Sequence, residues 1–300
     1  MKSADQILRE ISGLRVELGK LKAGFEALRT ELLPAGSLLG GRLRSRGLKI
    51  HRENPVETVL IPPDLPPELT AQFYERMKKY SFRLFLRELV RVQGPFRPGD
   101  LTDYCSSRVA EQYTRFLKAT STVEPFGGDA YRLNRIGISS FGPTLEWFVA
   151  QMFEREFASP AAFGVHFRET DVGGDYDVLA AWEGRLVYVE VKSSPPRSIE
   201  DPEVSAFFLR LCDLIPDVAF FFDDTHLRMK DKVIELFLRE MEERPVDIPL
   251  SHPPERLSDE IYHVDHWLYI LNSKRDILGN FTLCLRDHLR QNRGRFLSTL

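Results

Sequence analysis

Two apolar runs rich in β-branched residues flank Glu183-Gly184, and this arrangement constrains the fold more than any other feature of the chain. The runs cover residues 176–182 and 185–192, and each has the length and composition of a buried strand. Two residues between two such runs are typical of a tight β-hairpin turn. The sequence therefore predicts a hairpin whose strand register is set by the turn.

The predicted hairpin brings acidic side chains together. A two-residue turn places Asp177 opposite Glu190 and Asp175 opposite Lys192. Directly paired residues project from one face, and so do residues two apart, so these side chains cluster unless the register slips by one residue. Three carboxylates in buried strands are costly, and one lysine does not neutralise them. A hard divalent cation would, because Mg²⁺ prefers oxygen ligands.

At these residues the chain resembles the PD-(D/E)XK nuclease superfamily, whose members share the restriction-endonuclease-like fold. Asp177 matches the first acid of the family motif, and Glu190-Val191-Lys192 matches its second element on the following strand. The residue before the first acid is Tyr176 where the family pattern has proline, which makes the motif less specific here.

The resemblance implies metal-dependent hydrolysis of phosphodiester bonds, with Mg²⁺ or Mn²⁺ as the cofactor. Asp177 and Glu190 would be metal ligands, and Lys192 would orient or activate the attacking water. The family often adds a glutamate on the helix before the sheet, and Glu146 would be this accessory ligand or a residue that holds the water. Asp175 would be a further accessory residue.

The order of the predicted elements agrees with an α/β fold that has the family's αβββαβ core, over residues 142–243. The elements are a helix over 144–157, strands over 165–171, 176–182 and 185–192, a helix over 200–214, a strand over 217–223 and a helix over 228–243. We assign residues 137–300 to this nuclease-like domain. Residues 244–300 would extend the sheet, bind substrate or mediate oligomerisation.

Residues 70–136 resemble a winged helix-turn-helix domain in the order of their elements, without any invariant motif. The elements are helices over 72–92, 98–104 and 108–119, followed by hairpin strands over 122–126 and 131–134. In DNA-binding members one helix enters the major groove and the hairpin touches the backbone. The resemblance implies base contacts from Arg108, Gln112 and Arg115 and phosphate contacts from Arg132 and Arg135. Winged helices also bind proteins or connect domains, and these alternatives stay open.

Apolar residues recur at alternating spacings of four and three between Ile7 and Leu32, which predicts a coiled-coil helix over residues 1–33. We expect a homodimer through residues 5–33, and the alternative is an amphipathic helix packed on its own domain. Residues 34–69, rich in proline, glycine and arginine, are interpreted as a linker. Its basic stretch either contacts phosphates or lies in solvent.

Charge is unevenly distributed along the chain. Residues 70–136 carry 12 basic and 7 acidic residues, a net charge of +5, whereas residues 137–300 carry 18 and 28, a net charge of −10. This division favours a basic segment that meets a polyanion and an acidic domain that concentrates carboxylates.

Three separated cysteines, no N-terminal apolar segment and no apolar run of about 20 residues favour a cytoplasmic chain without membrane contact.

Two further clusters are weaker candidates. His263, Asp265 and His266 lie close in sequence, but no fourth ligand accompanies them, so a structural or surface role is favoured over a metal site. Asp223-Asp224 end a predicted strand near the catalytic cluster, where capping of the next helix is their ordinary role.

The sequence therefore predicts a metal-dependent endonuclease that acts on duplex DNA in preference to RNA, is targeted by the winged-helix module and works as a dimer. The alternative is a DNA- or protein-binding regulator whose nuclease-like domain is degenerate or senses a ligand. A hairpin held only by surface salt bridges is a third interpretation, which the apolar neighbours of the acids disfavour. Restriction, defence, repair and mobile-element roles all use this fold, and the sequence does not choose among them.

Overall fold

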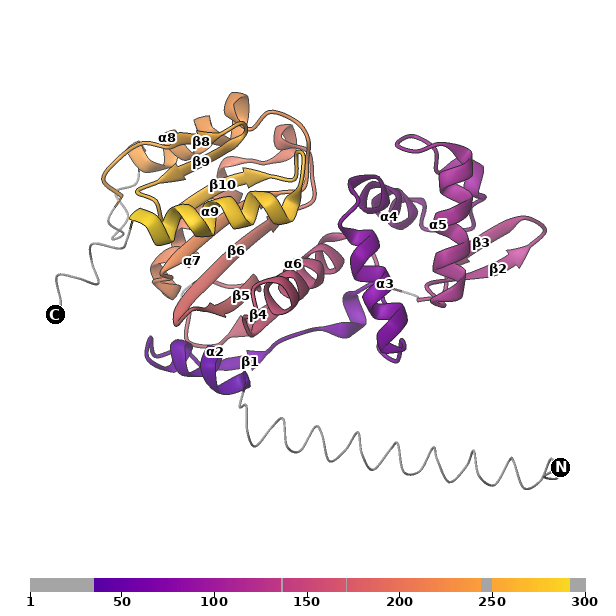
Figure 1. The fold of residues 1–300 in the computed structure, drawn as a ribbon, viewed down its shortest axis with the longest axis horizontal. Helices are drawn as coiled ribbons and strands as arrows, with labels where there is room; N and C mark the ends of the chain where they lie inside the picture. Colours follow the sequence, from indigo (N-terminus) through magenta and orange to yellow (C-terminus); the bar gives the residue numbers. More distant parts are fainter. Residues whose placement is uncertain (1–34, 136, 171, 244–249, 292–300) are drawn as a thin grey trace, which may run out of the picture.

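A computed structural model of the chain describes residues 35–135, 137–170, 172–243 and 250–291. These residues form one large mixed sheet with helices on both faces and a smaller helical module with its own hairpin, placed to one side of the sheet (Figure 1). The predicted α/β class is confirmed. The coiled-coil prediction for the first 33 residues lies outside the described residues.

The sheet has eight strands in the order β1-β4-β5-β6-β7-β10-β9-β8. The three central strands β6, β7 and β10 run parallel, and every other pairing is antiparallel. The strands are β1 (Ile50–Arg52), β4 (Ala161–Phe167), β5 (Tyr176–Trp182), β6 (Arg185–Lys192), β7 (Val218–Asp223), β8 (Glu255–Ser258), β9 (Ile261–Val264) and β10 (Leu268–Asn272).

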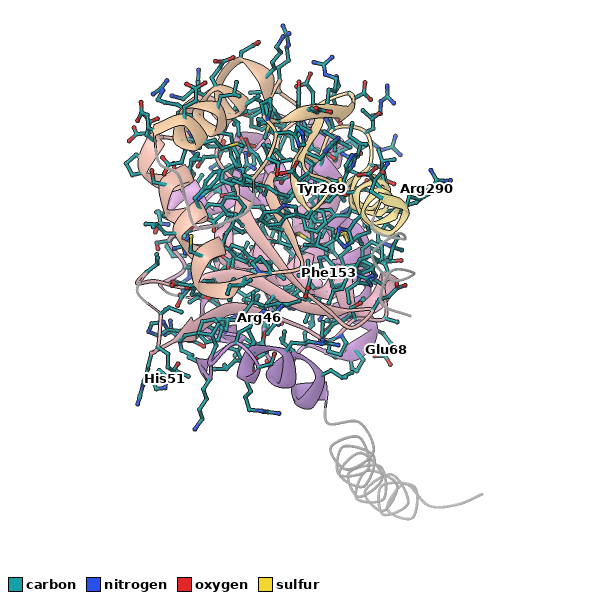
Figure 2. All side chains as sticks on the ribbon, turned by 90° about the vertical axis from the view of Figure 1, so that its left-hand side faces the viewer. Arg46, His51, Glu68, Phe153, Tyr269 and Arg290 are labelled. Atoms are coloured by element: carbon teal, nitrogen blue, oxygen red, sulfur yellow. The ribbon has the colours of Figure 1, made fainter. Side chains whose placement is uncertain are left out.

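Helices bury apolar side chains against both faces of this sheet. One face packs against α6 (Gly142–Glu156) and α9 (Ile277–Gln291), and the other packs against α2 (Ala35–Arg44), α7 (Asp201–Leu214) and α8 (Glu235–Glu243). Figure 2 shows Phe153 of α6 inside the packed layer, whereas His51 and Arg290 lie at the periphery. The strands of the predicted acidic cluster therefore lie in a sheet that helices cover on both faces.

The hairpin register agrees with the sequence prediction. Glu183 and Gly184 have φ values of 44° and 75°, so both turn residues adopt the left-handed conformation of a tight two-residue turn. Trp182 pairs with Arg185 across the turn, and the same ladder continues to the pair formed by Val178 and Val189. Both predicted strand boundaries are confirmed.

The remaining core elements are present with two boundary differences. Strand β4 begins and ends four residues earlier than predicted, because its pairing with β5 starts at Ala161 and ends before the glycine-rich loop that follows. The helix predicted over 228–243 opens with a π-helical turn over Lys230–Ile234, and α8 follows it.

The linker prediction for residues 34–69 is wrong for most of that segment. Helix α2 packs Leu39 and Leu43 into the core, and β1 pairs with β4 at the edge of the sheet. Apolar burial here outweighs the glycines that suggested an unstructured connection. Part of the basic stretch contacts the protein itself, since Arg46 donates hydrogen bonds to the Ile215 carbonyl and to the Asp217 carboxylate.

The helical module follows the predicted order, with one helix divided into two. Residues 72–92 form the end of α3 and all of α4, because Lys79 is extended and the two helices dock on different partners. The third helix and the hairpin are confirmed. The elements are α3 (Pro67–Met77), α4 (Tyr80–Val92), a 3₁₀ turn (Pro98–Asp100), α5 (Ser107–Ala119), β2 (Val123–Gly127) and β3 (Ala130–Leu133).

The C-terminal segment extends the sheet, which was one of the three roles considered for it. Strands β8, β9 and β10 continue the sheet beyond β7, and α9 covers them. Asp265 and His266 adopt positive φ values and form the turn between β9 and β10. Across the described ranges, no helix has the length and apolar character needed to span a membrane.

A buried ion pair joins the helical module to the sheet. Arg83 of α4 donates from Nε and Nη2 to the two carboxylate oxygens of Asp224 at 2.9 and 2.8 Å. The two side chains are 1% and 0% exposed. Arg87 donates to the Asp224 carbonyl at 3.2 Å, and Tyr80 stacks on His226 with ring centroids 3.7 Å apart. The module is therefore docked at the carboxyl end of β7.

Replacing Arg83 with Met should lower the free energy of unfolding by about 3–5 kcal/mol, because buried Asp224 would keep only its longer ion pair with Arg87, at 3.6 Å. Adding Asp224→Asn should recover part of the loss. Denaturant unfolding followed by circular dichroism measures both changes. The control is Arg239→Met, whose surface pair with Asp201 is worth less than about 1 kcal/mol; equal losses for the two arginines would contradict this account.

Candidate active site

The acidic cluster forms where β5 begins and β6 ends. The antiparallel ladder runs to Val178 and Val189, so Asp177 and Glu190 occupy the next positions outward. Asp177 is half-buried, and its Oδ2 accepts a hydrogen bond from the Val191 N–H at 2.6 Å. The confirmed register thus places the two predicted metal ligands on neighbouring strands at one edge of the fold.

Glu190 is 1% exposed, and protein donors engage both of its oxygens. Oε1 lies 2.9 Å from Lys192 Nζ and 3.2 Å from Arg210 Nη1. Oε2 lies 3.0 Å from Arg210 Nη1 and also accepts a hydrogen bond from the Tyr188 hydroxyl. Since a carboxylate offers about four acceptor positions, these contacts occupy Glu190 completely.

Lys192 is held between two acids. Its Nζ contacts Glu190 and, at 3.1 Å, Glu203 Oε1 of α7. Burial opposes the charged form, but the neighbouring carboxylates outweigh it and raise the pKa of Lys192 above its usual value. Sequence reasoning missed Glu203 and Arg210, although the predicted helix over 200–214 already carried both beside the hairpin.

Glu146 lies in the first turns of α6 and faces the start of β5. Its carboxylate is close to Gly142 and Gly164, since a Cβ built on those glycines would lie 3.7 and 3.9 Å from its two oxygens. Gly164 stands in the ladder position that faces Asp177, between two regular pairs of β4 and β5. No described side chain donates a hydrogen bond to Glu146, so its oxygens are open.

Asp175 does not pair with Lys192 as the extended register would have it. The residue precedes β5 in an irregular segment, and both of its oxygens lie 3.3 Å from Nη2 of Arg52 in β1. The glycine-rich loop turns the chain away before the ladder reaches Asp175. Its charge still acts on the cluster, because it contributes to the raised pKa of Glu146.

Crowding of acids perturbs the titration of the cluster. Burial, together with the charges of Glu190 and Glu146, raises the pKa of Asp177 well above its usual range. Burial, together with the charges of Asp175 and Glu190, raises the pKa of Glu146 to about 8. Strongly perturbed carboxyls beside a specific charged partner are typical of functional sites.

The donor set has the chemistry that Mg²⁺ or Mn²⁺ requires, without forming a complete protein cage. In the part of the chain that the structure describes, no three His, Cys, Asp or Glu side chains come together as a metal site. Mg²⁺ is usually held by one or two carboxylates, with waters and substrate phosphates completing its shell. The open oxygens of Glu146 and Asp177 meet that requirement, so the residues present fit the ion.

Asp223 is a further buried acid at the same edge. Its Cα pairs with Lys192 on one side and Asn272 on the other, so the three side chains share a face. The side chain is fully buried, and neither oxygen has a hydrogen-bond partner among the described residues. Burial and the charge of Asp224 raise its pKa to about 8. Asp223 is thus placed beside the cluster and does not cap a helix.

The predicted base-contacting residues share the outer face of α5. Arg108, Gln112 and Arg115 are all exposed, at spacings of four and three residues. Arg115 and Glu111 also line a hollow of about 220 Å³ between α5, the 3₁₀ turn and β3. This face is available to a partner.

The two arginines predicted to contact phosphate differ in their surroundings. Arg132 is exposed on β3 and pairs with Glu124 across the hairpin at 2.6 Å. Arg135 is turned inward, and its Nη1 donates to the carbonyls of Val56, Val59 and Ile61 at 2.9, 2.6 and 2.9 Å. That nitrogen holds the preceding segment in place, which removes it from a contact with phosphate.

The histidines near the C-terminus form a structural cluster. The rings of His263 and His266 stack at 3.9 Å, and His266 Nδ1 lies 2.7 Å from Asp287 Oδ2. Asp265 instead pairs with His252 at 2.6 Å. The three residues considered in the sequence therefore do not converge on one point.

No protein-family model matches the chain, and no curated protein matches it significantly. The solved structures that resemble it include two with a TM-score of 0.44 each. Protein VC1899 from Vibrio cholerae is 14% identical, over 68% of this chain and 55% of that one. Can2 from Sulfobacillus thermosulfidooxidans, in complex with cyclic tetra-adenylate, is 11% identical, over 84% of this chain and 61% of that one. The chain thus spans less than two thirds of either structure, and similarity at this level adds nothing to what its own residues show.

Replacing Asp223 with Asn should flatten the pH dependence of stability. Its carboxyl has a pKa of 3.8 when free and about 8 when folded, so folding takes up a proton between these values. Stability therefore falls as pH rises through this window, by about 1.4 kcal/mol per pH unit from this one group. Unfolding free energies measured at pH 5, 6, 7 and 8 check this.

The variant should lose most of that slope and gain stability at pH 8 relative to the parent chain. The exposed acid Asp231 supplies a matched control, and Asp231→Asn should leave the slope unchanged. An unchanged slope in Asp223→Asn would show that the buried carboxyl is paired in solution.

Proposed function

We propose that the protein is a metal-dependent nuclease that hydrolyses phosphodiester bonds at the cluster formed by Glu146, Asp177, Glu190 and Lys192. The observation that carries the proposal is the confirmed hairpin register, which places Asp177 and Glu190 on adjacent strands with Lys192 two residues further on. Acids crowded in this way, with a lysine among them, suit a site that handles a cation and a phosphate.

Each residue then has a defined part. Glu146 and Asp177 would hold Mg²⁺ or Mn²⁺ through their open oxygens, and the bound ion would supply charge neutralisation for the phosphoryl group. Lys192 keeps a fixed positive charge beside them, because Glu190 and Glu203 hold its ammonium group. That charge can orient a water or stabilise negative charge that develops at phosphorus.

The helical module would bind the nucleic acid. The exposed face of α5 carries Arg108, Gln112 and Arg115, and duplex DNA is the preferred substrate because a helix of this kind fits its major groove. RNA is the competing substrate. Dimerisation through residues 5–33 would bring two such sites to two strands.

A second candidate function has its own supporting observation. Tyr188, Lys192 and Arg210 occupy every acceptor position of Glu190, which suits a domain that has lost catalysis. In that case the protein is a DNA- or protein-binding regulator. The two candidates differ in what happens when Lys192 is removed.

Lys192→Ala should abolish cleavage and leave nucleic-acid binding unchanged. Plasmid, linear duplex, single-stranded DNA and RNA would each be incubated with Mg²⁺, Mn²⁺ or EDTA, and the products resolved on gels. Removing a residue that stabilises the transition state should cost at least about a hundredfold in rate. Cleavage should require the metal.

Lys230→Ala, at an exposed lysine that is not part of the cluster, is the matched control and should cleave normally. Lys192→Gln, which keeps a polar side chain, guards against loss of folding and should also be inactive. Metal-dependent cleavage that survives both Lys192 variants would place the chemistry elsewhere. Absence of cleavage in the parent chain on all substrates would favour the regulator.

Arg108→Ala combined with Arg115→Ala should weaken binding to duplex DNA at least about tenfold, because each base contact is worth about 1–3 kcal/mol. Fluorescence anisotropy at two salt concentrations measures the loss. The control pair is Arg228→Ala with Arg239→Ala, two exposed arginines outside the helical module. Equal affinities for both double variants would remove α5 from the interface.

A further inference from the structure

Glu190 and its neighbours differ sharply in how their charges are balanced. Asp177 accepts one backbone hydrogen bond and Glu146 accepts none from the described residues, whereas Glu190 is in contact with two cations and a hydroxyl. A divalent cation drawn to Glu146 and Asp177 therefore meets a third carboxylate whose acceptor positions are already filled.

Among the three donors to Glu190, Arg210 is the one that an incoming metal ion would displace most readily. Lys192 has a second acid, Glu203, and Tyr188 carries no charge. Arg210 contributes two of the contacts to Glu190, both from Nη1, while its Nε is buried without a hydrogen-bond partner in the described chain. The guanidinium is thus only partly satisfied where it lies.

The loop that precedes β5 has room for this arginine because of a glycine. Gly174 adopts a φ of 100°, and a Cβ built on it would lie 3.3 Å from Arg210 Nη2. The guanidinium of Arg210 is therefore packed between the loop and Glu190, with its side chain 14% exposed. It sits at the boundary between the core and the open side of the cluster.

We propose that Arg210 is a built-in counter-cation that competes with the divalent metal for Glu190 and so sets the metal affinity of the site. The inference rests on the proposed function, since it concerns the same carboxylates. With Arg210 in place, Glu190 is neutralised and the ion is held by Glu146 and Asp177 alone. When the ion gains Glu190 as well, the Arg210 contact is given up.

Loss of the arginine then has two linked consequences. The ion-free protein becomes less stable, because Glu190 keeps only one cationic partner in a buried position. The metal-bound protein loses less, because the ion takes over the neutralisation. Since a ligand stabilises a fold more the more tightly it binds the folded state, metal should stabilise the variant more than the parent chain.

The test is a Mn²⁺ titration of the full chain by calorimetry, with parallel thermal melts in Mn²⁺ and in EDTA. Arg210→Met removes the charge and should bind Mn²⁺ about tenfold more tightly, equivalent to about 1.4 kcal/mol. Its melting temperature should be lower than that of the parent chain in EDTA and should rise more in Mn²⁺. Arg210→Gln should behave alike if the Met variant folds poorly.

Three controls isolate the cause. Arg210→Lys keeps the charge and should stay close to the parent affinity. Arg239→Met removes an exposed arginine of α8 and should change nothing. Asp177→Asn added to Arg210→Met should abolish the tightened binding, which shows that the same carboxylates are responsible.

Two negative results are distinguishable. If the parent chain binds Mn²⁺ and Arg210→Met binds it equally or more weakly, the competition is refuted while the proposed function stands. If neither protein binds Mn²⁺, the proposed metal site is refuted and this inference with it.

Discussion

The buried ion pair between Arg83 and Asp224 fixes the position of the helical module relative to the large sheet. Asp224 follows directly after β7, and its N–H donates to the Lys192 carbonyl at the end of β6. Arg83 therefore anchors α4 to the strand end that borders Lys192. A paired charge so deeply buried tolerates little displacement, since separation would expose each ion to an apolar core. The α5 face is thus held in a fixed relation to the acidic cluster.

Charge balance within the cluster is local and unequal. On the α7 side, Glu190 is neutralised by Lys192 and Arg210, so it behaves as part of the core. Near α6, Glu146 and Asp177 lack comparable donors, and burial together with neighbouring carboxylates raises the pKa of each. This difference between the two sides of the cluster explains why the acids are crowded although no three of the described side chains form a complete metal site. It also means that a cation from solution has most to gain beside α6.

Local patterns in the sequence predicted the hairpin and much of its surroundings. Glu183-Gly184 determine a turn, the turn determines the register, and the register brings Asp177 beside Glu190. Long-range partners carry no such local signal. Nothing in the sequence near Arg83 indicates that its partner is an acid more than a hundred residues away. In α2, the glycines suggested a linker, although its leucines pack into the core. Asp175 escaped prediction because the ladder ends before reaching it.

Polar residues gather where the parallel strands end, and one of them is a buried carboxyl without a hydrogen-bond partner among the described residues. Ligands in open α/β sheets bind beyond the carboxyl ends of the strands. Lys192, Asp223 and Asn272 occupy that edge in register, yet Asp223 has no hydrogen-bond partner in the described chain. An apolar residue would pack there at lower cost. An unpaired buried carboxyl of this kind is more typical of functional sites than of structural cores, and Asp223 lies next to Lys192 across the β6–β7 ladder.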